Sequence, residues 1–89
     1  MDMIEIVAQA KVITAIENLG GVDGVWISIG DLRKITNMES EDFDAAMIAL
    51  AHRFSIIAAP EDNQKTITAA DTAAAVKIGG QWCHLVTVA

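Results

Sequence analysis

The chain contains few of the residues on which several protein classes depend. Its 89 residues include one cysteine, one proline, no tyrosine, and only six lysines and arginines against twelve aspartates and glutamates. A single cysteine excludes a disulfide within the chain and is typical of a reducing compartment. The net charge of −6 disfavours general binding to nucleic acid, because Lys and Arg supply much of that affinity by neutralising phosphates.

The chain also lacks the segments that direct a protein into or through a membrane. The N-terminal sequence MDMIEIVAQA carries acidic residues and has no basic segment followed by an apolar one, unlike a signal peptide. No run of about 18 apolar residues is present. We therefore expect a cytoplasmic protein with no membrane partner. The length predicts one domain over residues 1–89.

Motifs for catalysis or metal binding are missing as well. The sequence has no phosphate-binding glycine loop, no dinucleotide fingerprint and no G-x-S-x-G. His52 is isolated, and Cys83 and His84 would point to opposite faces of a strand, so these residues lack the spacing of a metal site. We expect a protein that is not an enzyme and has no cofactor and no metal ion.

What the chain does have is an excess of apolar residues, 53% of the total. Residues 2–19 contain neither Pro nor Gly and end at Gly20-Gly21, which predicts a helix. A helix on a small core needs one apolar stripe, whereas this helix has two, so it is either fully buried or shared with a second subunit. The stripe predicted to face the core comprises Ile4, Ala8, Val12, Ala15, Ile16 and Leu19. The second stripe, predicted to mediate self-association as a two-fold homodimer, comprises Met3, Ile6, Ala10 and Ile13.

The centre of the chain predicts two helices joined by a turn. A short strand over residues 25–29 precedes a helix over 32–36, which turns Leu32 and Ile35 inward. A second helix over 41–53 begins with acidic residues, which the helix dipole favours there. The core side of this second helix is predicted to comprise Phe43, Ala46, Met47, Leu50 and Phe54.

The C-terminal third predicts a strand, a helix and another strand. Residues 55–59 read as a strand, and residues 66–80 as a helix that Thr68 and Asp71 cap at its start and Gly79-Gly80 end. Residues 81–88 alternate in polarity and predict the last strand. The expected fold is α+β and mainly helical, in the order helix, short strand, helix, helix, strand, short helix, strand.

This order resembles the winged helix-turn-helix superfamily, and residues 28–60 carry the resemblance. SIGDLRKIT is similar to the strand that enters the second helix, MESEDFDAAMIALAHRF to the turn and third helix, and SIIAAP to the first wing strand. The resemblance implies a winged-helix fold for most of the chain. One departure is the wing, where an alanine-rich helix takes the place of a short basic hairpin suited to the minor groove.

The third helix departs from the superfamily in its chemistry. In DNA-binding members this helix presents basic and polar side chains to base edges. Here the outward face offers carboxylates and methyl groups, which predicts a surface for another protein. The alternative is a face covered by the chain's own N-terminus or last strand. The predicted partner surface comprises Glu41, Ala45, Ile48, Ala49 and His52.

We therefore expect a non-catalytic regulatory or adaptor protein that binds itself and another protein. The alternative is a DNA-binding transcriptional regulator, in which dimerisation through the first helix sets the half-site spacing. An inhibitor that imitates DNA through its acids fits less well, because apolar residues interrupt the charges. In the DNA-binding alternative, the residues that contact phosphates are Arg33, Lys34, Arg53 and Lys65.

Overall fold

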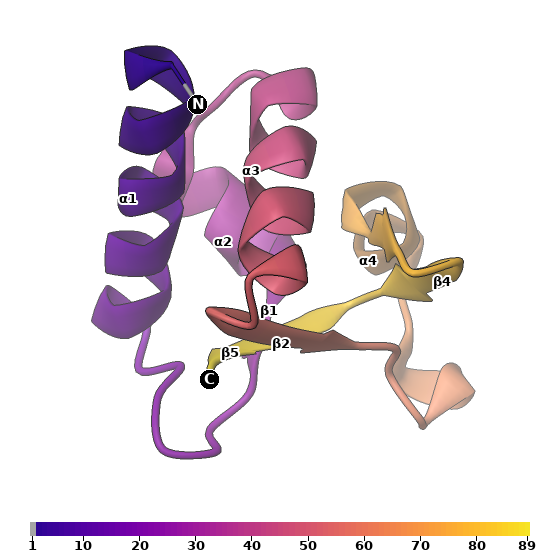
Figure 1. The fold of residues 1–89 in the computed structure, drawn as a ribbon. Coiled ribbons are helices and arrows are strands. Elements are labelled where there is room, and N and C mark those ends of the chain that lie inside the picture. Colours follow the sequence, from indigo (N-terminus) through magenta and orange to yellow (C-terminus); the bar gives the residue numbers. More distant parts are fainter. Residues whose placement is uncertain (1) are drawn as a thin grey trace.

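The computed structural model describes residues 2–89, which form an α+β fold that is about half helical (Figure 1). Three helices precede most of the strands, and a short helix and a hairpin lie between the second strand and the last one. The elements are α1 (Met3–Asn18), β1 (Ile27–Ser28), α2 (Ile29–Thr36), α3 (Ser40–His52), β2 (Ile56–Ala59), the 3-10 helix η1 (Gln64–Thr66), α4 (Ala69–Ala74), β3 (Val76–Ile78), β4 (Gln81–Cys83) and β5 (Leu85–Val88).

The first helix forms where the sequence predicts it. The Asp2 side chain caps α1 by accepting a hydrogen bond from the Glu5 backbone N–H at 2.9 Å. The helix ends before Gly20, which has a φ of 85°. The next glycine, Gly21, lies so close to α1 that a Cβ there would stand 2.7 Å from the Ile16 side chain. A larger residue at this position would push the end of α1 away from the sheet.

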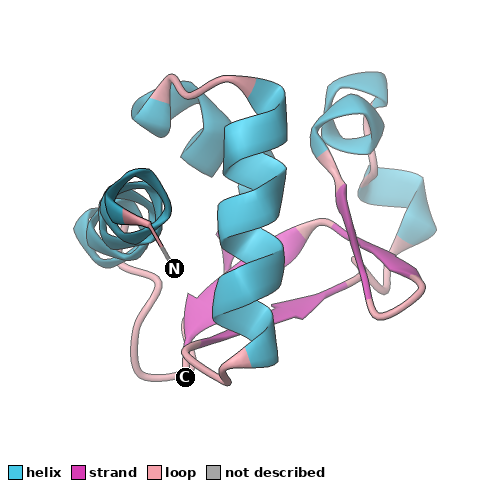
Figure 2. Ribbon diagram, turned by 45° about the horizontal axis from the view of Figure 1, so that its top comes forward, coloured by secondary structure: helices cyan, strands magenta, loops and turns pink. Residues whose placement is uncertain are grey.

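The three-stranded sheet joins distant parts of the chain. Its strands are antiparallel in the order β1-β5-β2, so the last strand lies between the two earlier ones. Val86 of β5 pairs with Ile27 on one side and with Ala58 on the other. Figure 2 shows α3 lying across the strands of this sheet. The core is therefore closed only when the C-terminal strand is in place.

The core lies between the sheet and the helices. Side chains from α1, α2, α3 and the sheet all contribute to one cluster. Four core predictions for α3 are confirmed, because Phe43, Ala46, Met47 and Leu50 are buried. The fully buried side chains with the largest volumes are Phe43, Ile16, Ile29, Leu32, Met47 and Leu50.

Three residues predicted to face the core are exposed instead. Phe54 is 84% exposed, because the chain turns into the left-handed region there (φ 58°) and no longer follows the helical stripe. Ile35 is 51% exposed, because the buried face of α2 runs through Ile29, Leu32 and Thr36. Ile4 is 77% exposed, because the buried residues of α1 begin only at Gln9.

The predicted helix over residues 66–80 is correct only in its first half. The capping box is confirmed, since the Asp71 N–H donates to Thr68 Oγ1 and the Thr68 N–H to Asp71 Oδ2, both at 3.0 Å. The helix then stops at Ala74, and Val76–Ile78 pairs with β4 as a hairpin. Gly79 and Gly80 have φ values of 58° and 81°, which suit a two-residue hairpin turn and not the predicted helix end.

The predicted last strand is divided in two. β4 belongs to the hairpin and β5 to the three-stranded sheet, and His84 lies between them. The His84 backbone N–H donates to the Ala59 carbonyl, and its own carbonyl accepts from the Ile29 N–H, each at 2.9 Å. These two bonds fix the point at which the chain passes from one sheet to the other.

Truncating Leu50 and truncating Phe54 should have very different effects on stability. We expect Leu50→Ala to lower the free energy of unfolding by about 2–5 kcal/mol, since it leaves a cavity among buried side chains. Phe54→Ala should cost less than about 1 kcal/mol, because that ring is mostly in water. Urea denaturation followed by circular dichroism measures both. Equal losses would contradict the placement of Phe54 outside the core.

Candidate interaction surface

The outer face of α3 is open in the structure. The helix lies between α1 on one side and the region of α4 and its hairpin on the other (Figure 1). Glu41, Ala45 and His52 are exposed, Ile48 is 37% exposed and Ala49 is half-buried. Residues 2–89 therefore leave most of this face uncovered, and α1 adjoins it only beside Ala45 and Ala49. The alternative that the chain's own N-terminal residues or last strand cover the whole face is wrong for the described residues.

The second stripe of α1 is largely exposed as well. Met3 is 71% exposed, Ile6 is 48% exposed and Ala10 is also exposed. Ile13 differs from the other three, because it is half-buried and packs against the core. The start of α1 thus presents an apolar surface that its own core does not use, and only Ile13 also supports the fold.

Two hollows flank the contact between α1 and α3, and Gln9 lines both. The smaller one, of about 280 Å³, contains three of the four predicted self-association residues beside Arg53. The larger one, of about 430 Å³, joins Ala45 and Ala49 of the predicted partner surface to the start of α1. The sequence did not predict this junction, which places part of the predicted partner surface beside α1 residues outside the predicted self-association stripe. The residues of the larger hollow that belong to none of the predicted surfaces or core stripes are Glu5, Val7, Gln9, Lys11, Met38 and Asp42.

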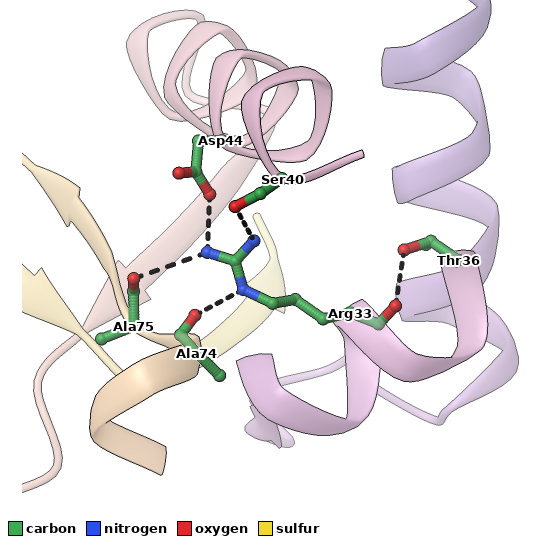
Figure 3. Close-up of polar contacts among 6 residues, drawn as sticks. All are labelled: Arg33, Thr36, Ser40, Asp44, Ala74 and Ala75. Carbon is green, nitrogen blue, oxygen red and sulfur yellow. Dashed lines mark hydrogen bonds and ion pairs between the residues drawn. The ribbon is translucent and has the colours of Figure 1, made fainter. Parts of the chain in front are cut away.

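The Arg33 side chain makes contacts within the fold that the sequence did not predict (Figure 3). Its Nε donates to the Ala74 carbonyl at 2.7 Å, and its Nη2 donates to Asp44 Oδ1 at 2.6 Å. The guanidinium also lies 4.5 Å from the centre of the Phe43 ring. This side chain therefore joins α2, α3 and α4. No local signal predicts the bond to Ala74, because the two residues are 41 positions apart.

The four cations considered for phosphate contact do not form one cluster. Arg33 is turned toward α3 and α4, whereas Arg53 lies on the α1 side of α3. Lys34 is exposed on α2, and Lys65 is exposed in η1. A phosphate backbone would meet separated charges at these residues and not a continuous basic patch.

The remaining polar side chains of interest make local contacts. His84 Nδ1 accepts a hydrogen bond from the Glu61 N–H at 3.1 Å. Cys83 is a free, buried cysteine, and burial raises the pKa of its thiol. Hydrogen bonds from the Thr68 backbone and hydroxyl lower the pKa of Asp71. Within residues 2–89, no three His, Cys, Asp or Glu side chains are grouped so that they would hold a metal ion.

Comparison of the chain with protein-family models, curated proteins and solved structures finds no match. The functional interpretation therefore depends on the surfaces described above. In the part of the chain that the structure describes, no helix has both the length and the apolar character needed to cross a membrane.

Removing the Arg33 side chain should loosen α4 and the hairpin. We expect Arg33→Met to lower the free energy of unfolding by about 1.5–3 kcal/mol, since charged hydrogen bonds are lost from a partly buried position. Lys34→Met is the matched control, with an effect within about 0.5 kcal/mol. A double-mutant cycle with Asp44→Asn measures the coupling of the pair. Equal stability of Arg33→Met and Lys34→Met would contradict the structural role.

Proposed function

We propose that the chain is a winged helix-turn-helix domain that acts through contacts with other proteins and not through catalysis. The order of its elements supports the winged-helix assignment, because α1, β1, α2, α3, β2 and β5 follow one another as the resemblance implies. The antiparallel pairing of β2 with β5 supports it further, since these are the two strands that border a wing. In this assignment, η1, α4 and the β3–β4 hairpin enlarge the wing.

The observation that carries the proposed function is the exposed apolar start of α1. Met3, Ile6 and Ala10 are exposed to water, although burying their apolar side chains would lower the free energy. A two-fold homodimer would bury the same stripe of both copies and so remove both exposed surfaces together. We propose a homodimer formed through α1, with the outer face of α3 left to contact another protein in a regulatory or adaptor role.

DNA binding is the second candidate, and the open outer face of α3 after a short turn from α2 favours it. The charges of the chain, however, offer little attraction for the phosphates of DNA. Arg33 is engaged by Asp44 and Ala74, which leaves Lys34, Arg53 and Lys65 as the dispersed contacts for phosphates. The exposed carboxylate of Glu41 would repel phosphates on the face that must enter the groove.

A single charge on α1 should separate the two copies. We expect the wild type to be a dimer by light scattering after gel filtration and Ile6→Asp to be a folded monomer, because a carboxylate in the apolar interface would lose its water. Ile6 is preferred to Ile13, which also packs against the core.

Val25→Asp is the matched control, since Val25 is an equally exposed apolar residue outside α1. This variant should remain a dimer. A monomeric wild type, or a monomeric Val25→Asp together with a monomeric Ile6→Asp, would contradict a dimer formed through α1.

A further inference from the structure

The larger hollow between α1 and α3 is a groove whose walls are mostly apolar, and the buried residues that line it are Gln9 and Ala46. Ile4, Val7 and Ala8 form one wall, and Ala45 and Ala49 form the other. Small side chains on α3 leave room between the two helices, and the volume is about 430 Å³. We refer to this site as the α1–α3 groove. It is distinct from the stripe proposed for self-association, because Met3, Ile6, Ala10 and Ile13 do not line it.

The rim of the α1–α3 groove is acidic at one end. Helices α1 and α3 both start at the same end of the molecule (Figure 1), and each carries acids in its first turn. Glu5 and Asp42 therefore lie on the two sides of the groove. Neither carboxylate forms an ion pair within residues 2–89. Lys11 is the single cation among the groove residues.

We propose that the α1–α3 groove binds a basic amphipathic helix of a partner protein. Apolar residues of that helix at i, i+3, i+4 and i+7 would enter the groove, as in other helix-in-groove complexes. Flanking Lys or Arg residues would pair with Glu5 and Asp42. This inference rests on the proposed function, since it names the class of partner that the α3 face would contact.

The charge of the chain argues against a second copy as the occupant. A second copy would have to supply basic residues beside an apolar stripe, but its own α1 starts with Asp2 and Glu5. Like charges facing one another across an interface oppose association, and Glu5 and Asp42 both line this groove. The stripe proposed for self-association lies beside Arg53 instead, so this argument applies to the groove and not to the dimer.

A pair of fluorescent peptides tests this proposal by anisotropy. Both carry leucines at the i, i+3, i+4 and i+7 positions of a helix, with lysines at all flanking positions in one and glutamates in the other. We expect the 89-residue chain to bind the lysine peptide at least tenfold more tightly than the glutamate peptide. Added salt should reduce this preference, because the rim carboxylates are in water.

Two matched pairs of variants place the peptide in the groove. Glu5→Gln with Asp42→Asn should weaken binding of the lysine peptide about fivefold, whereas Glu17→Gln with Asp23→Asn removes the same charge elsewhere and should change nothing. Ala45→Arg blocks the wall of the groove with a side chain that helices accept, and it should weaken binding more than about tenfold. Ala73→Arg, on the exposed side of α4, should have no effect.

Three results would overturn the proposal: no binding of the lysine peptide, equal affinity for both peptides, or equal effects of the groove variants and their controls. Circular dichroism of each variant excludes misfolding as the cause of a loss. The light-scattering experiment on Ile6→Asp is independent of this one. A dimer without peptide binding would overturn the groove proposal alone, and peptide binding by a monomer would overturn the dimer alone.

Discussion

The Arg33 guanidinium extends from α2 and contacts both α3 and α4. It donates to the Ala74 carbonyl at the end of α4 and to the Asp44 carboxylate on α3, and it stacks near the Phe43 ring. The segment between β2 and β5 is long and has few buried side chains of its own. Besides Arg33, α4 is held by its packing against α2 and by the β3–β4 hairpin, whose Val76 and Cys83 belong to the core. The segment between β2 and β5 is therefore anchored in part by one partly buried cation.

This constraint also shapes the exposed surfaces. Because Arg33 and Asp44 pair on the α4 side of α3, the free carboxylates and small apolar side chains remain on the α1 side. There the apolar start of α1 continues past the core and meets Ala45 and Ala49. The same arrangement removes one cation from contact with phosphates. The Arg33–Asp44 pair and the proposed contact surface therefore lie on opposite sides of α3.

Local patterns predicted what depends on neighbouring residues, and failed where distant contacts decide. The span of α1 and the Thr68–Asp71 capping box follow from caps and breakers a few positions apart. Residues 76–78 continue an alanine-rich helical pattern, but pairing with residues 81–83 makes them a strand. The contacts of Arg33 could not be predicted from the sequence either, because its partners lie on two other helices. The α1–α3 groove could not be predicted from local patterns either, because its two walls come from helices that are far apart in the sequence.

The amide NMR spectrum of ¹⁵N-labelled protein tests the central claim most directly, which is that the chain binds another copy through α1 and does not bind DNA. It is recorded at high and at low protein concentration, and then with a mixed-sequence DNA duplex at low salt. The account predicts that dilution shifts the amides of Met3–Ala10 and that DNA shifts none. Shifts at Lys34, Arg53 and Lys65 that appear with DNA and vanish with salt, with no change on dilution, would contradict it.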